Sequence, residues 1–256
     1  MLPGPDLVSL VAGAFAFVPG LAIGSFLNVV VARVPLRRSI VSPPSACMSC
    51  GNELAWYDNI PLVSWLVLRG RCRTCGVRIA ARYPAVELAT ALLVAGCFWK
   101  FGLTGSAFVA AFFCIVLVAV SGTDLEHHVI PNRIVLPAAV LVLAANTTLH
   151  LSPEWALGAL GASGFLFAAA LAYPKGMGMG DVKLALLMGA ALGRTVPVAL
   201  MIGMLAALIP GLYLLARHGS AARKMRIPFG PFLAFGSIIA LFWGHALLSA
   251  YWSIGH

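Results

Sequence analysis

The run LVSLVAGAFAFVPGLAIGSFLNVVV, residues 7–31, decides the fold class of this chain. It contains no Asp, Glu, Lys or Arg. A helix of about 20 apolar residues is long enough to cross the hydrocarbon core of a bilayer. No Lys or Arg precedes the run, so it lacks the charged start of a signal peptide. We therefore predict that the run is a transmembrane helix.

The composition of the whole chain extends this prediction. Of the 256 residues, 61% are hydrophobic and 10% are charged, whereas ordinary soluble domains have about 25% charged residues. The difference excludes a soluble globular protein, a disordered chain and a disulfide-rich secreted module. The predicted fold class is an all-α polytopic membrane protein with about eight transmembrane helices. The seven further helices are expected at residues 84–99, 106–120, 134–149, 155–173, 182–192, 196–215 and 231–253.

The positive charges indicate how these helices are oriented. The net charge is +9, which in a soluble protein would suggest nucleic-acid binding. With eight helices and an outside start, however, only Lys100 and Arg194 of the 17 Lys and Arg residues fall on the outer side. The positive-inside rule then places the remaining loops in the cytoplasm. We expect these cationic loops to contact anionic membrane lipids, and we expect no nucleic-acid partner.

One predicted helix, residues 182–192, is too short to cross a bilayer. Eleven helical residues measure about 16 Å, against roughly 30 Å of hydrocarbon core. Either the helix is broken at Gly193-Arg194, or its start is recessed into the membrane. Asp181 lies at that start.

The cytoplasmic loop at residues 32–83 contains two Cys-x-x-Cys-Gly motifs. They place Cys47 and Cys50 before Gly51, and Cys72 and Cys75 before Gly76. This spacing matches a zinc ribbon in which four thiolates hold a structural Zn²⁺. A loop of this size holds too small a core to be stable alone, so a metal would support its fold. Two disulfides or one redox pair are the alternatives, and the reducing cytoplasm disfavours both. We expect Cys97 and Cys114, which lie in apolar runs, to be core residues.

Two of the eight acidic residues are expected at the cytoplasmic ends of membrane helices. Asp124 follows one apolar run, and Asp181 opens another after Gly178 and Gly180. Charged groups beside membrane helices are costly and mark functional sites. Two carboxylates brought together share one proton, which gives an ionised group to activate water and a protonated group to polarise a peptide carbonyl. The alternate glycines would let an extended substrate peptide approach closely.

Other interpretations of these aspartates remain open. Asp181 could be an ordinary helix N-cap with Lys183 reaching the interface, and Asp124 a solvated helix end. A proton-coupled transporter would use both carboxylates as relay groups, although we find no internal repeat of the kind common in transporters. A purely structural membrane scaffold carrying zinc is a third alternative.

An ordered set of motifs resembles a known family. It begins with Gly24-Ser25-Phe26-Leu-Asn28, Arg33-Val-Pro35 and the two cysteine motifs, which flank Trp56-Tyr57-Asp58-Asn59-Ile60-Pro61. It continues with Arg82-Tyr83-Pro84 and Glu87, Asp124 with Ile130-Pro131, Gly178-x-Gly180-Asp181-x-Lys183 and Pro228-Phe229-Gly230-Pro231-Phe232. The chain resembles the prepilin leader peptidases, which are type IV leader peptidases of the GxGD class of membrane aspartic proteases.

The resemblance implies an activity and its partners. Substrates would be prepilin or pseudopilin precursors of type IV pilus or type II secretion systems. Their basic leader would be removed at the cytoplasmic face of the bacterial inner membrane. Many members also N-methylate the new N-terminus using S-adenosylmethionine, and Glu87 is our candidate residue for that methyl transfer.

The resemblance also assigns residues and domains. It makes Asp124 and Asp181 catalytic, and we expect Gly178, Gly180, Lys183 and Glu126 to contact substrate. The chain would then consist of a first helix (1–31), a zinc-binding loop (32–83) and a seven-helix peptidase domain (84–256). Two positions depart from many members, which have Asp in place of Glu126 and Asn132. We expect cleavage to survive both changes because Asp124 is retained.

Overall fold

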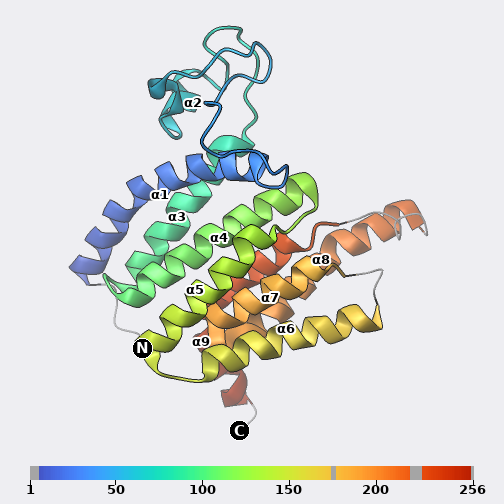
Figure 1. Cartoon of the computed structure of the whole chain (residues 1–256). Helices are drawn as coiled ribbons and strands as arrows, with labels where there is room; N and C mark the ends of the chain where they lie inside the picture. Colours follow the sequence, from blue (N-terminus) through green and yellow to red (C-terminus); the bar gives the residue numbers. More distant parts are fainter. Residues whose placement is uncertain (1–5, 174–176, 220–226, 255–256) are drawn as a thin grey trace. The chain divides into compact units, whose positions relative to one another are not determined.

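The computed structural model describes residues 6–173, 177–219 and 227–254 (Figure 1). Four of the 17 Lys and Arg residues, Lys175, Arg223, Lys224 and Arg226, lie outside this part of the chain. The chain divides into two compact units, Met1–Gly122 and Thr123–His256. Helix α4 contains the boundary between them, and each unit is described by itself below.

The predicted all-α fold class is confirmed over the described residues. Extended pairing there is limited to two isolated antiparallel bridges, Ala46 with Glu53 and Arg71 with Arg78. Two short 3₁₀ helices, η1 (Trp56–Asn59) and η2 (Gly193–Thr195), accompany the α-helices. The α-helices are α1 (Leu7–Arg33), α2 (Val63–Val67), α3 (Arg82–Phe101), α4 (Gly105–His127), α5 (Asn132–His150), α6 (Glu154–Ala172), α7 (Met179–Leu192), α8 (Val196–His218) and α9 (Gly230–Ile254).

All eight predicted membrane helices are present among these elements. Within the described residues, seven stretches are long and apolar enough to cross a membrane. One of the seven, Met179–His218, contains α7, η2 and α8 together. The 14 residues of α7 measure about 21 Å, which is shorter than a bilayer core. The chain turns at Gly193, whose φ of 51° is in the left-handed region that favours glycine.

In the first unit, α1 and α3 run side by side (Figure 1). Helix α1 begins after Asp6, whose carboxylate accepts a hydrogen bond from the N–H of Ser9 at 2.9 Å. The Asn28 amide of α1 donates to the carbonyl of Tyr83 in α3 at 3.2 Å. Cys97 and Cys114 are buried as expected, and their sulfur atoms lie 3.8 Å apart. The contact between Asn28 and Tyr83 connects α1 to the start of α3, which follows the cysteine-containing loop.

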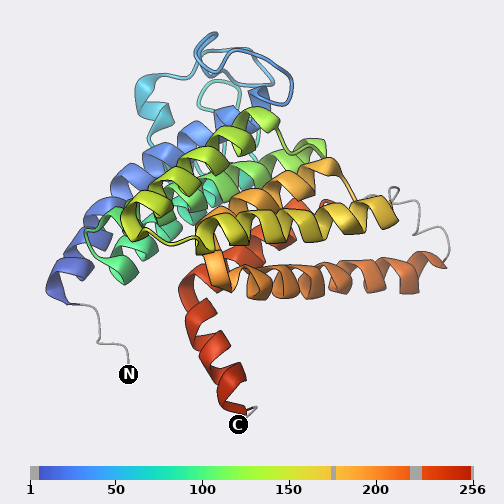
Figure 2. The same cartoon turned by 60° about the horizontal axis from the view of Figure 1, so that its bottom comes forward.

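In the second unit, α7 is held by neighbouring helices. It lies beside α6 (Figures 1 and 2), where Gly158 and Gly189 let the two backbones meet. The Asn146 amide of α5 donates to the carbonyl of Ala190 at 2.9 Å. The side chains of Leu184, Leu187 and Met188 are fully buried. This packing sets the position of the residues at the start of α7.

Candidate active site

Asp124 lies in the last turn of α4 and is 7% exposed. Its Oδ2 accepts a hydrogen bond of 2.8 Å from the N–H of Gly230, the first residue of α9. A β-carbon on Gly230 would lie 2.9 Å from that oxygen and 3.3 Å from the carboxylate carbon. Only glycine therefore fits at position 230. The hydrogen bond places the Asp124 carboxylate against the N-terminus of α9, where the partial positive charge of the helix favours a carboxylate.

Asp181 lies in the first turn of α7 and is 9% exposed. The helix begins three residues earlier than predicted, so Gly178 is its N-cap and Asp181 is its third residue. Asp181 Oδ2 accepts a 3.2 Å hydrogen bond from the N–H of Gly178. The N–H of Asp181 donates in return to the carbonyl of Gly178 at 3.1 Å. This reciprocal pair is the local signal that extends the helix beyond the apolar run.

The two carboxylates share one pattern. Each has its Oδ2 held by the N–H of a glycine, while neither Oδ1 has a hydrogen-bond partner within the described residues. Both belong to the unit Thr123–His256. One oxygen of each group is thus fixed, and the other is left for water or a peptide.

The residues predicted to contact substrate lie in different settings. Gly178 is exposed, whereas an added β-carbon on Gly180 would lie 2.9 Å from Ile130 of this chain. The Lys183 ammonium donates to the Asn132 amide oxygen at 2.9 Å, at one of the two positions that depart from many family members. Glu126 is exposed in the last turn of α4.

Gly230 is a site residue that our reading of the sequence did not single out. It is 106 residues away from Asp124 in the chain, and no periodicity links the two. The available signal was its place in the Pro228–Phe232 motif, directly before a proline and an apolar run.

The four motif cysteines meet in the loop segment between α1 and α3 of the first unit. Their sulfur atoms all lie within 4.8 Å of one another and could hold a metal ion. The Cys47 and Cys75 sulfurs are 3.8 Å apart, which is about the separation in a tetrahedron with zinc–sulfur bonds of 2.3 Å. All four are free thiols. The donor set and its spacing therefore fit a tetrahedral metal centre.

The backbone of each motif forms the same turn. The N–H of Gly51 donates to the carbonyl of Cys47 at 2.9 Å, and that of Gly76 donates to Cys72 at 3.0 Å. Gly51 and Gly76 have φ values of 70° and 71°, in the left-handed region that glycine adopts without strain. Hydrogen bonds from the N–H groups of Cys50 and Ser49 lower the pKa of the Cys47 thiol to about 6. This favours the thiolate, which is the form that binds metal.

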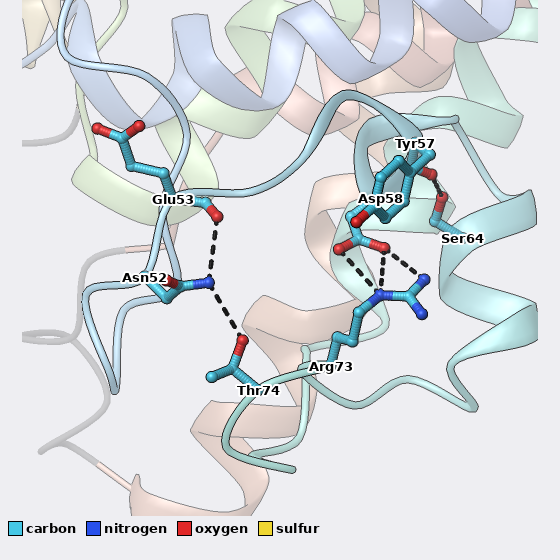
Figure 3. Close-up of polar contacts among 7 residues, drawn as sticks. All are labelled: Asn52, Glu53, Tyr57, Asp58, Ser64, Arg73 and Thr74. Atoms are coloured by element: carbon cyan, nitrogen blue, oxygen red, sulfur yellow. Dashed lines mark hydrogen bonds and ion pairs between the residues drawn. The ribbon is translucent and has the colours of Figure 1, made fainter.

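We call the loop at residues 32–83, which contains the four cysteines, the four-cysteine module. Polar side-chain contacts connect its parts (Figure 3). The Asn52 amide donates to Thr74 Oγ1 at 3.1 Å, which joins the two motifs. Arg73 donates to Asp58 of η1 through both its Nε and one terminal nitrogen, with distances of 2.8 to 3.2 Å. Its guanidinium also lies over the Tyr57 ring, 5.2 Å from the ring centre.

Glu87, the candidate for methyl transfer, lies in α3 and is 8% exposed. Its Oε2 accepts a 2.8 Å hydrogen bond from the N–H of Leu62, the N-cap residue of α2. Leu62 has a φ of 59°, a strained value for a leucine. Glu87 therefore connects the four-cysteine module to the start of a membrane helix.

The fold and these sites define a class: a polytopic membrane protein with two buried carboxylates at helix ends and a four-cysteine centre. Residues 18–101 match the bacterial peptidase A24 N-terminal domain, and residues 111–212 match the type IV leader peptidase family. The chain belongs to the type IV leader peptidase family. Neither matched family is a family of transporters, and these matches give the transporter alternative no support.

Curated relatives agree with this assignment. The prepilin leader peptidase/N-methyltransferase of Bacillus subtilis is 38% identical over 240 residues, which cover 92% of this chain and 96% of the relative. The protein of that name from Pseudomonas aeruginosa is 38% identical over 263 residues, covering 91% and 90%. The one from Myxococcus xanthus is 45% identical over 179 residues, covering 70% of this chain and 45% of the relative's length. No solved structure matches the chain significantly.

Proposed function

We propose that the chain is a membrane aspartic endopeptidase that removes the basic leader of prepilin-like precursors and then N-methylates the new N-terminus. The observation that carries the cleavage step is the matched pair of carboxylates. Asp124 and Asp181 each have one oxygen held by a glycine N–H and one oxygen available. This arrangement fixes the direction of both carboxyl groups. It leaves each Oδ1 free, so that the ionised group can accept a proton and the protonated group can donate one.

Peptide hydrolysis follows from one proton shared between these two groups. The ionised carboxylate takes a proton from water through Oδ1 as the water oxygen attacks the peptide carbon. The protonated carboxyl gives its proton to the carbonyl oxygen. When the tetrahedral intermediate collapses, the C–N bond breaks and the new amine takes the proton acquired from water. A hydroxyl of the intermediate returns a proton to the other carboxylate, so the product is a carboxylic acid and the pair again shares one proton. The hydrogen bond from Gly230 stabilises Asp124 at the stages in which it is ionised.

The orientation of the helices decides on which side of the membrane a precursor is cut. The positive-inside rule puts the four-cysteine module and the ends of α4 and α6 in the cytoplasm. Asp124 and Asp181 would then lie at the cytoplasmic face of the bacterial inner membrane, where the junction between a basic leader and an apolar helix is also expected. Gly178, Gly180, Lys183 and Glu126 are the residues we assign to substrate contact.

The module at residues 32–83 would hold one structural Zn²⁺ through Cys47, Cys50, Cys72 and Cys75, and residues 84–256 would act as the peptidase domain. S-adenosylmethionine, when bound, supplies an electrophilic methyl group for the new amine. Glu87 Oε1 has no hydrogen-bond partner among the described residues. It is therefore available to accept a proton from that amine.

The test is to incubate the purified chain in lipid vesicles with a precursor that has a basic leader and an apolar helix. We expect cleavage at the junction of the leader and the helix, and a product heavier by one methyl group only when S-adenosylmethionine is present. Intact-mass measurement reports both steps. An uncleaved precursor, with the enzyme folded and metal-loaded, would refute the proposal.

A further inference from the structure

Four apolar side chains form an outward-facing surface on η1 and α2, which we call the η1–α2 patch. Trp56 is 80% exposed and Val67 is 71% exposed, and Val63 and Leu66 are more than half exposed. The membrane spans end at Arg33 and resume at Arg82, so the patch belongs to the segment between two spans. Clustered exposed apolar side chains outside the spans mark an interaction surface.

The patch has a rigid support. The Ser64 hydroxyl donates to the carbonyl of Tyr57 at 2.6 Å, which joins α2 to η1 (Figure 3). The Trp65 indole N–H donates to the carbonyl of Ile79 at 3.2 Å, and the same ring covers Gly70. Ser64 and Trp65 therefore occupy the inner face of α2. Val63, Leu66 and Val67 are left on its outer face.

The contact with Glu87 sets the depth of the patch. The N–H of Leu62, at the start of α2, is bonded to Glu87 of α3. Glu87 is the sixth residue of a candidate membrane span that begins at Arg82. Five residues of helix measure about 7.5 Å, so α2 is attached at the boundary where α3 enters the bilayer. The polar headgroup layer occupies this level.

The chemistry of the patch matches that layer. Tryptophan is enriched at membrane–water interfaces, and arginines beside an apolar face favour anionic headgroups. Arg69 and Arg71 directly follow α2 and are exposed. We propose that the η1–α2 patch inserts into the headgroup region of an anionic bilayer and holds the four-cysteine module against the membrane. The proposal rests on the membrane fold and does not depend on peptidase activity.

The experiment measures tryptophan quenching by brominated lipids in vesicles that contain an anionic phospholipid. The full-length chain is compared with Trp56→Phe, so that the difference isolates Trp56 from the other five tryptophans. We expect brominated lipid to remove the Trp56 emission and aqueous acrylamide to have little effect on it. Val67→Asp should reduce this quenching, whereas Val41→Asp, at a residue 86% exposed in the same loop, should not.

Two results would overturn the proposal. In the first, Trp56 emission is quenched by acrylamide and not by brominated lipid, which means that the patch faces water. In the second, neither agent reaches Trp56, which means that protein covers the patch. Replacing the anionic lipid with a neutral one should weaken the quenching, and unchanged quenching would contradict the role given to the arginines. Equal helicity and metal content of all variants confirm that they fold alike.

Discussion

The hydrogen bond between Gly230 and Asp124 joins the last membrane helix to a carboxylate 106 residues earlier in the chain. It explains why glycine stands immediately before Pro231, since a β-carbon there would press on the carboxylate. The N–H of Gly178 likewise donates a hydrogen bond to the Asp181 carboxylate, within the first turn of α7. The two aspartates thus depend on glycine backbone groups for their direction, and no basic side chain is bonded to either in the described chain.

We therefore predict that Gly230→Ala lowers the cleavage rate. The added methyl group would displace the Asp124 carboxylate and weaken its hydrogen bond. A bond to a charged group contributes about 1.5–3 kcal/mol, which corresponds to a rate roughly 10 to 160 times lower. The measurement is kcat on a precursor peptide. Gly161→Ala is the matched control because an added β-carbon at Gly161 meets no atom within 4 Å. Wild-type cleavage by Gly230→Ala would argue against this contact.

At Glu87, cleavage and methyl transfer should separate. Glu87→Gln keeps an amide oxygen to accept the Leu62 N–H, so the module should stay attached, but the variant loses the basic carboxylate. We expect normal leader removal and an unmethylated product, read by intact mass. Glu53→Gln, at an exposed position of the same loop, should leave both steps unchanged. A methylated product from Glu87→Gln would show that Glu87 only positions the module.

At the scale of elements, the four-cysteine module is organised around its four sulfur atoms and not around a hydrophobic core. Two identical turns present four sulfur atoms, and side-chain contacts such as those of Arg73 with Asp58 and Asn52 with Thr74 connect them. The exposed position of most of the loop leaves little apolar burial to stabilise it. A bound metal would supply the missing stability.

Elemental analysis should accordingly find about one zinc per chain. Cys47→Ser and Cys72→Ser should each lose the metal and make the loop at residues 32–83 more sensitive to proteolysis. Cys97→Ala, which removes a buried thiol far from the module in the sequence, should retain the metal. A metal-free wild-type chain with a protease-resistant loop would contradict the assignment.

Sequence patterns predicted the elements better than the contacts between them. Apolar runs predicted the eight long helices, which form seven candidate membrane spans in the described residues, and the cysteine spacing predicted the four-sulfur cluster, because both signals are local. The start of α7 was placed three residues late, since glycines and Asp181 interrupt the apolar pattern although they belong to the helix. The bonds of Gly230 to Asp124 and of Leu62 to Glu87 join distant segments, and no period or motif spacing encodes such pairs.

At the scale of the whole molecule, the orientation of the helices determines where the aspartates act. The arginines between residues 33 and 82 should keep that loop in the cytoplasm. A protease site inserted between Ser39 and Ile40 should be cut only from the cytoplasmic side of sealed membranes. One inserted between Leu103 and Thr104, at the turn after α3, should be cut only from the other side. Cutting of both sites from one side would overturn the eight-helix topology.

The most direct test of the central claim is precursor cleavage by Asp124→Asn and Asp181→Asn. Asparagine keeps the shape of each side chain but cannot take up or give the shared proton. Each variant is reconstituted in vesicles with a prepilin-like precursor, and the product is weighed by mass spectrometry. Asp6→Asn, at the exposed N-cap of α1, serves as the control. We expect leader removal by the wild type and the control, and none by either variant at equal helicity and metal content. Leader removal by either variant at the wild-type rate would contradict the claim that these two carboxylates perform the chemistry.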